Sequence, residues 1–540
     1  MLKITLLALN SSYSHTNLAV RCIKKSLNDA GFGANYLEFS LKDKRGTILS
    51  ALFNAGAGVY GFSVYIWNRR EMLTIASDLK KLCPAAKIIF GGPEVSFDAE
   101  KLLDENPFID CVITGEGEAA FIKAAQIVES GGELPKVIDG NEFNGFERAG
   151  ILYDREENSA KKLLYYESAR GCPYRCAYCL SALSGRVRAK PAEQVLSELY
   201  EFEEFRDIKV IKFVDRTFNF DAKRARIIWN GLLDPKFTKC CHFEICGELL
   251  EDEDFELLSR FPKGKIQLEI GVQSTNPETL ARVGRKTDIP KLLAAISRLH
   301  EPGNIHIHAD LIAGLPGESF ERFGKSFDDL FGRCDMLQLG FLKLLRGSRL
   351  RNEVCSFGCI YSDEPPYEVL ATDCLSFNEI ELLHRIDDLN ERYVNSGAFG
   401  RTCRILFKMT DSPFNLLKNL AIGLDNDRLT LREISQANAY SELYDRTKTL
   451  FVHSDELLRA YQTALSLDFL TSQKTSLPKF GDFVFERSEN PALKRKFCNW
   501  ADENSVDYFA PALEVRAGRF LLDRKMLTAF EFDGEAYHSI

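Results

Sequence analysis

Three cysteines lie within eight positions of the segment ARGCPYRCAYCLSA, residues 169–182. They are Cys172, Cys176 and Cys179, too close together to pair comfortably with one another. A structural zinc site takes four ligands, and no fourth ligand stands nearby at zinc spacing. A cubane 4Fe–4S cluster usually holds each iron by one thiolate, so three protein thiolates leave one iron open. The spacing therefore predicts a 4Fe–4S cluster whose open iron binds a substrate or cofactor directly.

The composition of the chain is that of an ordinary globular protein. Its 540 residues suggest about three or four domains. A hydrophobic fraction of 45% and a charged fraction of 27% are typical of folded proteins. The net charge of −9 makes a nucleic-acid partner unlikely on charge alone, because such proteins usually carry a basic excess. The 15 cysteines follow no regular framework, which favours a reducing cytoplasm.

No membrane segment is expected from the hydropathy pattern. No apolar run approaches the ~18 residues that a transmembrane helix needs. The first ten residues, MLKITLLALN, contain one lysine and a short apolar stretch but no small-residue cleavage site. They are better interpreted as a first buried strand than as a signal peptide. We therefore expect a cytoplasmic protein with no membrane partner.

Residues 1–140 alternate short apolar runs with helical patterns, which predicts an α/β fold with a Rossmann-like, doubly wound parallel sheet. The apolar runs are KITLLAL, NYLEFS, GVYGFSVY, AKIIFGG and CVITGEGE. In such sheets the ligand lies beyond the carboxyl ends of the strands. The polar or glycine-rich segments at those ends are NSSYSHTN, SVYIWN, GGPEVS and GEGE.

A charged linker is predicted over residues 141–162, after which strand and helix patterns alternate again over residues 163–354. The candidate strands are LLYYESA, IKVIKFVD, HFEICGE, KIQLEIGVQ, IHIHADLIAG and MLQLGFLKLL. Six βα units predict a partial, open (β/α)6 barrel of the TIM type, with its active site at the carboxyl ends of the strands. The cysteine loop follows the first of these strands, which places it at that rim.

Residues 355–540 predict a mainly helical domain. Amphipathic helices are expected over YEVLATDCLSFNEIELLHRIDDLNERYVN and SDELLRAYQTALSLDFL, and a short strand pair over ALEVRAGRFLLDRKMLTAFEFDG. Nothing in these patterns assigns chemistry to this region.

The motif CPYRCAYC resembles the CxxxCx(aromatic)C signature of radical S-adenosylmethionine (SAM) enzymes. The resemblance implies that SAM occupies the open iron, that the cluster donates one electron, and that SAM splits to give a 5′-deoxyadenosyl radical. Tyr178 matches the aromatic residue that touches the adenine in that family. Three unrelated buried cysteines remain the ordinary alternative, and the combined spacing, aromatic residue and position disfavour it.

Other rim segments fit the same resemblance. Asp215, in FVDRTFNF, could reach SAM or the substrate. The segment LEIGVQSTNPETLARVGRKT implies hydrogen bonds from Glu269 and Gln273 to SAM, and a contact of Arg285 with its carboxylate. DLIAGLPGE matches the family's glycine-rich stretch near the adenine. A solvated rim charge for Glu269 and a surface position for Arg285 stay open as alternatives.

A Rossmann-like domain ahead of such a barrel resembles the cobalamin-binding class of the superfamily. The resemblance implies that the strand-end loops hold cobalamin, with glycines letting the backbone approach the flat macrocycle. The candidate contacts are Ser12, Tyr13, Ser14, His15, Ser63, Tyr65, Trp67, Gly91, Gly92, Pro93, Glu94, Gly115, Glu116 and Gly117. The remainder of the chain is similar to a C-terminal domain of uncharacterised function that accompanies a subgroup of these proteins.

One feature of many cobalamin domains is absent. The DxHxxG motif, whose histidine ligates cobalt, has no match, because Tyr13 stands two places before His15 and Leu18 three places after it. The lower axial ligand of cobalt therefore stays open, and His15 is better interpreted as a loop-anchoring or substrate-side residue. A nucleotide is the rival ligand, but no GxGxxG follows the first strand.

The resulting functional hypothesis is a cobalamin-dependent radical SAM methyltransferase acting on an unactivated carbon or a phosphorus centre. We expect a small-molecule or peptide substrate and an electron donor such as a flavodoxin or ferredoxin. The first alternative is a cobalamin-assisted rearrangement, cyclisation or oxidation without methyl transfer. Methylthiolation of tRNA fits less well, because NSSYSHTN lacks the expected cysteines. A cobalamin carrier without turnover would not need an open iron.

Overall fold

The computed structural model divides the chain into two compact units. Unit 1 comprises residues 1–319, 332–335 and 340–376, and unit 2 comprises residues 320–331, 336–339 and 377–540. The expected linker, residues 141–162, lies mostly outside the described residues. The described residues are 2–140, 146, 150–153, 163–184, 186–205, 207–426, 434–472, 486–487, 519–520, 530–532 and 537–539.

The first part of unit 1 is a parallel six-stranded sheet with the order β2-β1-β3-β4-β5-β6, which confirms the predicted doubly wound fold. The strand order reverses between β1 and β3, so a ligand site is expected beyond the carboxyl ends of these two strands. The strands are β1 Lys3–Asn10, β2 Gly33–Ser40, β3 Val59–Ser63, β4 Lys87–Gly91, β5 Cys111–Gly115 and β6 Val137–Gly140. The helices are α1 Leu18–Asp29, α2 Arg45–Ala55, α3 Arg69–Leu82, α4 Ala99–Glu105 and α5 Gly117–Glu129.

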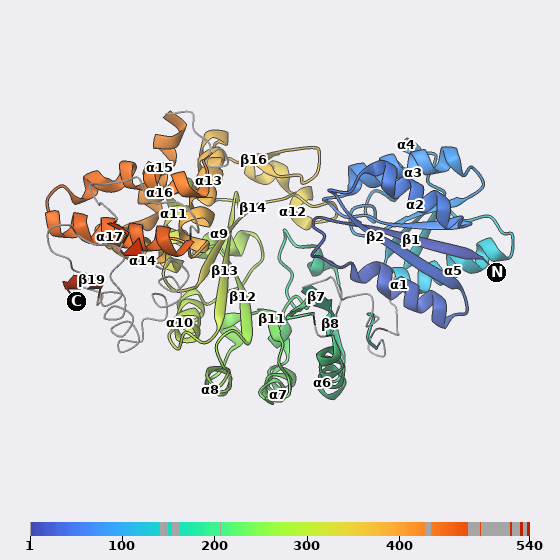
Figure 1. Ribbon diagram of the computed structural model, residues 1–540. Coiled ribbons are helices and arrows are strands. Elements are labelled where there is room, and N and C mark those ends of the chain that lie inside the picture. Colours follow the sequence, from blue (N-terminus) through green and yellow to red (C-terminus); the bar gives the residue numbers. More distant parts are fainter. Residues whose placement is uncertain are drawn as a thin grey trace. The chain divides into compact units, whose positions relative to one another are not determined.

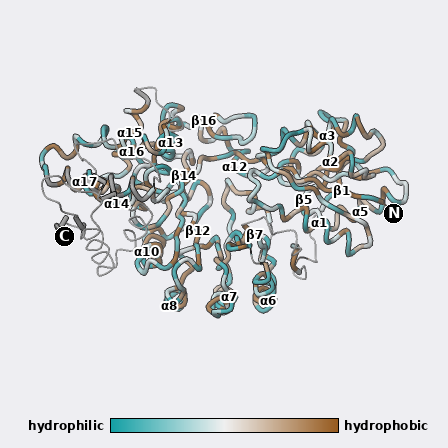
Figure 2. Tube along the Cα trace, in the orientation of Figure 1, coloured by the Kyte–Doolittle hydropathy of each residue, from teal (hydrophilic) through white to brown (hydrophobic). Residues whose placement is uncertain are grey.

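Helices cover both faces of this sheet. In Figure 1, α2, α3 and α4 lie on one face and α1 and α5 on the other. One hydrophobic cluster packs side chains such as Leu7 and Phe90 against α2, α3 and α4, and a second packs Leu6 and Ile89 against α1 and α5. All five residues of β3 are buried, and the tube around β1 is mostly hydrophobic in Figure 2. The sheet interior therefore offers no polar surface, and chemistry is left to the loops at the strand ends.

The barrel sheet is open and has the order β14-β13-β12-β11-β10-β7, as the six βα units predicted; its strands β7 to β13 belong to unit 1. The strands are β7 Leu163–Tyr166, β10 Val210–Phe213, β11 Cys240–Ile245, β12 Ile266–Gln273, β13 His306–Ala313 and β14 Met336–Phe341. The intervening helices are α6 Ala192–Glu201, α7 Ala222–Leu232, α8 Asp252–Ser259, α9 Pro277–Arg282 and α10 Ile289–His300. Along β12 and β13, buried apolar residues alternate strictly with half-buried ones, so only one face of each strand is covered.

A small hairpin holds the cysteine loop. Strand β8, Ala169–Arg170, pairs antiparallel with β9, Arg188–Ala189, and Arg170 lies opposite Arg188. The sequence pattern did not predict this hairpin, because two-residue strands show no periodicity.

The described part of unit 2 is mainly helical, as expected. Its helices are α11 Phe320–Leu330, α13 Phe377–Leu389, α14 Gly400–Leu406, α15 Pro413–Asn426, α16 Gln436–Thr447 and α17 Asp455–Ser472. A π-helical turn, Asn390–Asn395, continues α13. Asp328 in α11 accepts hydrogen bonds from the Phe414 amide, at 2.8 Å, and from Ser412, at 2.5 Å, which fixes α11 on the start of α15. No helix among the residues described combines the length and apolarity needed to cross a membrane.

One expectation for the C-terminal region was wrong in detail. The helix predicted from Tyr367 begins only at Phe377, because Glu368 bridges Lys343 and Val369 starts strand β16, Val369–Ala371. The Leu344 amide donates to the Tyr367 carbonyl and the Val369 amide to the Leu342 carbonyl, both at 2.9 Å. Most of the strand pair predicted within residues 512–534 lies outside the described residues. Of its described parts, β18, Arg519–Phe520, pairs with β17, Glu486–Arg487, and β19, Phe530–Phe532, pairs with β20, Tyr537–Ser539.

Candidate cofactor site

The loop that carries the three cysteines is built by backbone hydrogen bonds. The amide of Cys179 donates to the Cys176 carbonyl at 3.1 Å, and the Cys172 amide donates to Ser184 Oγ at 3.2 Å. Gly171 has a φ of +103°, and a Cβ there would collide with the Arg186 carbonyl oxygen. The loop therefore turns tightly directly before Cys172, a conformation that glycine adopts without strain.

The surroundings of these thiols suit a negatively charged group. Cys176 is only 7% exposed, and Arg285 Nη1 lies 4.0 Å from its Sγ. Burial raises the pKa of the Cys172 thiol, so iron binding would have to displace its proton. The buried Nε of Arg285 has no hydrogen-bond partner among the described residues. A cation with an unused donor beside three thiols fits a thiolate-held cluster and an anionic ligand on it.

This site differs from a site for one metal ion. Within the described ranges, no three His, Cys, Asp or Glu side chains converge closely enough to hold a single ion. A cubane is bound differently, because each thiolate binds its own iron. Tyr178 lies beside Cys176, and burial raises the pKa of its hydroxyl while Arg285 opposes that rise.

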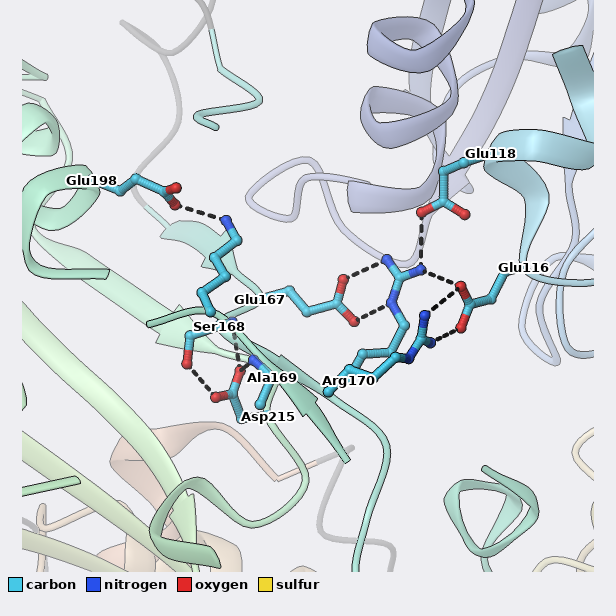
Figure 3. Close-up of polar contacts among 10 residues, drawn as sticks. Glu116, Glu118, Glu167, Ser168, Ala169, Arg170, Glu198 and Asp215 are labelled. Carbon is cyan, nitrogen blue, oxygen red and sulfur yellow. Dashed lines mark hydrogen bonds and ion pairs between the residues drawn. The ribbon is translucent and has the colours of Figure 1, made fainter. Parts of the chain in front are cut away.

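Asp215 has a different neighbourhood from the one expected. Its carboxylate is 1% exposed and accepts hydrogen bonds from the Ser168 amide at 2.8 Å, the Ala169 amide at 3.0 Å and the Ser168 hydroxyl (Figure 3). Burial raises its pKa to about 6. Both oxygens are therefore engaged by the connection between β7 and β8, and not aimed at SAM or substrate. Asp215 fixes the backbone of Ser168 and Ala169, directly before the cysteine loop.

Glu269 and Gln273 lie on β12, on its half-buried face. Glu269 accepts from His242 Nε2 at 2.9 Å and from Lys212 Nζ at 3.2 Å. Burial alone would raise the pKa of Glu269, but these two partners lower it to about 2. Gln273 has a positive φ of 70°, and its side chain folds back over Gly271.

Two further carboxyl groups on the neighbouring strands escaped the sequence analysis. Burial and the nearby Glu269 raise the pKa of Asp310 to about 8, and burial raises that of Glu244 to about 7. In the register of the sheet, Glu244 lies beside Glu269, and Asp310 lies beside Gly271. The signal that could have found them is the polar residue at alternate positions of HFEICGE and IHIHADLIAG.

A cavity of about 1260 Å³ joins the carboxyl edge of the first sheet to the cysteine-loop hairpin. The hairpin side includes Arg170, Gly171 and Arg188. Its volume exceeds the usual range for small-ligand pockets, up to about 1,000 Å³, as a corrinoid macrocycle would require. Of the expected cobalamin residues, His15, Ser63, Tyr65, Trp67, Gly91, Gly92, Pro93, Gly115, Glu116 and Gly117 line it.

The aromatic part of this lining comes from the end of β3. The rings of Tyr65 and Trp67 stack with centroids 4.5 Å apart, and Trp67 Nε1 donates to the Leu9 carbonyl at 3.0 Å. Trp67 nevertheless remains 45% exposed. Glycines at Gly91 and Gly92 leave the adjacent wall without side chains. An apolar ring beside a bare backbone suits a large flat ligand.

Four expected cobalamin residues do not line this cavity: Ser12, Tyr13, Ser14 and Glu94. Tyr13 is 69% exposed, and Ser12 and Ser14 hydrogen-bond each other at 3.1 Å. Glu94 is 5% exposed. It forms ion pairs with Arg69 and Arg346, both at 3.4 Å, and accepts a hydrogen bond from the Tyr367 hydroxyl. Its charge needs buried partners, which turns it away from the cavity.

Glu116 lines the cavity, but its carboxylate is engaged in ion pairs. It contacts Arg170 at 3.1 Å and also Arg188, the facing residues of the β8–β9 hairpin (Figure 3). Arg170 further pairs with Glu118 at 3.0 Å and Glu167 at 2.8 Å. The GEGE segment therefore ties the first sheet to the hairpin that carries the cysteines.

His15 also faces the barrel sheet. Its Nδ1 lies 2.6 Å from the Tyr165 hydroxyl, and the two rings stack 5.9 Å apart. Asn10 donates to the His15 carbonyl at 2.8 Å, which fixes the loop backbone. These contacts match the loop-anchoring interpretation of His15.

Three protein families match consecutive parts of the chain. The B12 binding domain matches residues 4–125, the radical SAM superfamily matches residues 166–330, and a protein of unknown function family (DUF4080) matches residues 355–537.

Individual relatives are distant. The 2-(S-pantetheinyl)-carbapenam-3-carboxylate methyltransferase of Streptantibioticus cattleyicolor is 25% identical over 49% of this chain and 43% of its own length. Hopanoid C-3 methylase of Methylococcus capsulatus is 25% identical over 57% of this chain and 62% of its own length. The chain therefore spans less than two thirds of either relative.

A solved structure shares the fold. The radical S-adenosylmethionine methyltransferase TsrM from Kitasatospora setae, with cobalamin and a [4Fe-4S] cluster bound, matches with a TM-score of 0.56. The match is 17% identical and covers 68% of this chain and 82% of that chain. The family matches show that the chain carries a B12 binding domain, a radical SAM domain and a DUF4080 domain in that order along the sequence, and the solved structure shares the fold.

Proposed function

We propose that the protein is a cobalamin-dependent radical SAM methyltransferase that methylates an unactivated carbon, or a phosphorus centre, of its substrate. One observation carries the proposal: a single large cavity is lined both by the carboxyl edge of the first sheet and by the hairpin that holds Cys172, Cys176 and Cys179. When bound, the cluster and SAM supply a carbon radical, and cobalamin carries the methyl group that the substrate receives.

In this proposal the chain's residues hold and orient the reacting groups. Cys172, Cys176 and Cys179 hold the cluster, and the unused Nε of Arg285 offers a hydrogen bond to the carboxylate of SAM. Tyr178 would contact the adenine of SAM, and Glu269 and Gln273 would offer hydrogen bonds to SAM from β12. Asp215 positions the loop from below through Ser168 and Ala169.

The cobalamin-binding set is reduced to the residues that line the cavity. Gly91 and Gly92 let the backbone approach the macrocycle, Trp67 offers an apolar face, and Gly115 and Gly117 turn beside the nucleotide tail. We assign cobalamin binding to residues 1–140, the barrel to residues 163–354 and a domain without assigned chemistry to residues 355–540.

We further propose a small-molecule or peptide substrate and a flavodoxin- or ferredoxin-type electron donor. A cytoplasmic location would suit the described cysteines, all of which are free thiols.

The test uses SAM that carries a trideuteromethyl group. Reconstituted protein, cobalamin and reductant are incubated with an anaerobic cell extract. We expect a product heavier by that methyl group, with S-adenosylhomocysteine and 5′-deoxyadenosine formed in step. Deoxyadenosine without S-adenosylhomocysteine or label transfer would overturn methyl transfer in favour of rearrangement, cyclisation or oxidation.

The control is the Cys172→Ala, Cys176→Ala, Cys179→Ala triple variant. It should lose nearly all of the iron that wild-type protein retains and should release no deoxyadenosine. Retention of four irons by this variant would contradict the cluster assignment.

A further inference from the structure

A short segment after the last barrel strand touches both loops that line the two sides of the site. This segment, Arg346–Leu350, is called the strap below. We propose that the strap is a positioning element that fixes the loop Gly91–Asp98 relative to the cysteine loop. The identity of the cofactors bound by those loops rests on the proposed function, but the contacts between the strap and the two loops do not.

At its first end the strap grips the loop after β4. Arg346 forms ion pairs with Glu94, at 3.4 Å, and with Asp98. Gly347 has a φ of +82°, and a Cβ there would collide with the ring of Phe97. The strap backbone therefore packs directly against this loop, with no side chain between them.

Tyr367, in the segment that follows the strap, bonds both Arg346 of the strap and Glu94 of the loop. Its hydroxyl donates to Glu94 and accepts from Arg346 Nε at 2.8 Å. Tyr367 and Glu94 are both buried, so their hydrogen bonds are shielded from competing water. Tyr367 lies within residues 355–537, the range of the DUF4080 match, which gives the start of that domain a structural role.

The gripped loop has two sides. Gly91, Gly92, Pro93 and Ser96 line the cavity, whereas Glu94 faces the strap. Because these residues are neighbours in one short loop, a displacement of Glu94 displaces the cavity wall.

At its second end the strap holds the cysteine loop. The Leu350 amide donates to the carbonyl of Ala177 at 2.9 Å, and Ala177 stands between Cys176 and Tyr178. The Ala177 amide donates in turn to the Val283 carbonyl at 2.8 Å. Leu350 is the fourth residue after Arg346, so the two contacts lie within about 14 Å along the chain.

The strap is itself firmly held. The amide of Leu342 donates to the Ala313 carbonyl, and that of Leu344 to the Tyr367 carbonyl, both at 2.9 Å. Arg351 Nη1 donates to the Leu344 carbonyl at 2.5 Å. Leu344 and Leu350 are fully buried. Because the strap is fixed in place and contacts one loop at each end, a displacement of one loop would displace the other. A misplacement of about 1 Å between reacting groups can lower a rate about a hundredfold.

The test compares Arg346→Gln with Glu353→Gln by amide hydrogen exchange of the cofactor-free full-length protein. Arg346→Gln removes the ion pairs of the strap. Glu353→Gln removes an exposed 3.4 Å pair with Arg349 of the strap and leaves the bonds of Arg346 to Glu94 and Asp98 and of Leu350 to Ala177 in place. We expect exchange to rise about tenfold in residues 91–98 and also in residues 176–179 in Arg346→Gln, and to stay unchanged in the control. Gly347→Ala should act in the same direction.

A second readout uses the cofactor-loaded protein and not its turnover. In the reduced state, the spin coupling between the cluster and cobalt(II) in the EPR spectrum should change in Arg346→Gln and stay constant in Glu353→Gln. A rise in exchange confined to residues 91–98, or equal in both variants, would overturn the strap. If wild-type protein bound no cobalamin, the proposed function would fail while the exchange comparison would still decide the strap.

Discussion

The first sheet and the barrel sheet have six strands each and the same alternation of strand and helix, yet they expose their residues differently. In the first sheet, β3 is buried at every position. In the barrel sheet, every second residue of β12 and β13 is half-buried. The first sheet therefore offers ligand chemistry only at its strand ends, whereas the barrel sheet offers it along a whole face.

The polar face of the barrel sheet carries charged groups that interact with one another. Lys212, His242 and Glu269 form a bonded set across three adjacent strands. The rings of His242 and His308 lie 5.6 Å apart. A doubly wound sheet cannot place such a set in its interior, because its two apolar faces are both covered by helices.

The largest expected effect is a loss of stability when buried side chains at neighbouring positions of β4 are truncated. Ile89 and Phe90 point to opposite faces of the first sheet and are both buried. Replacing either by Ala should lower the free energy of unfolding by about 2–5 kcal/mol. In β12, Leu268→Ala should cost a similar amount, whereas Gln267→Ala should cost less than about 0.5 kcal/mol. Urea denaturation measures the free energy of unfolding of all four variants. Equal losses for Gln267→Ala and Leu268→Ala would contradict the difference between the two faces of β12.

The second expected effect is a pH dependence of the free energy of unfolding that arises from the polar face of the barrel sheet. The folded pKa of Glu269, about 2, lies below its value in the unfolded chain, so its stabilisation is present above about pH 4.5 and is lost as the pH falls towards 2. Glu269→Gln should destabilise the protein by on the order of 3 kcal/mol at pH 7, and this deficit should shrink between pH 4.5 and 3.

The matched control for that measurement is Glu71→Gln, in the first half of unit 1. Glu71 forms an exposed pair with Arg45 at 3.1 Å. Its replacement should change the unfolding free energy by less than about 0.5 kcal/mol. A deficit of Glu269→Gln that stayed constant down to pH 3 would show that the bonds to His242 and Lys212 are not the cause.

A smaller effect is expected where the two sheets meet. Glu116→Gln weakens the ion pairs with Arg170 and Arg188, which are partly exposed. We expect a loss of about 1 kcal/mol in thermal unfolding at low salt. Because such pairs are screened, the loss should fall in 1 M salt. A loss independent of salt would point to packing, not charge.

The smallest effect is predicted for His15→Ala in the cobalt(II) EPR spectrum. His15 stands in no DxHxxG motif, and its contacts with Tyr165 and Asn10 anchor the loop, so the spectrum should be unchanged. Tyr165→Phe serves as the partner variant, and each should cost about 0.5–1.5 kcal/mol of stability. Disappearance of nitrogen superhyperfine splitting in His15→Ala alone would make His15 the axial ligand.

The local patterns predicted the fold well because each reports on burial of a single segment. The runs AKIIFGG and KIQLEIGVQ both predicted strands, and both form strands of parallel sheets. The helix expected from Tyr367 failed because Leu342 and Leu344 supply backbone partners that no local pattern reveals. The individual roles of the site residues stay predictions.

By itself, the sequence determined the two parallel sheets, the mainly helical C-terminal region and the place of the cysteine loop after β7, because hydrophobic periodicity and cysteine spacing are local properties. Only the tertiary structure decided which carboxylates face a ligand and which face an arginine. Glu94, Glu116 and Asp215 all stand at strand ends, yet each is turned by partners distant in the chain: Arg346, Arg170 and Ser168. The physical reason is that a buried charge must find a counter-charge or donors, and those come from elements that meet only when the chain is folded.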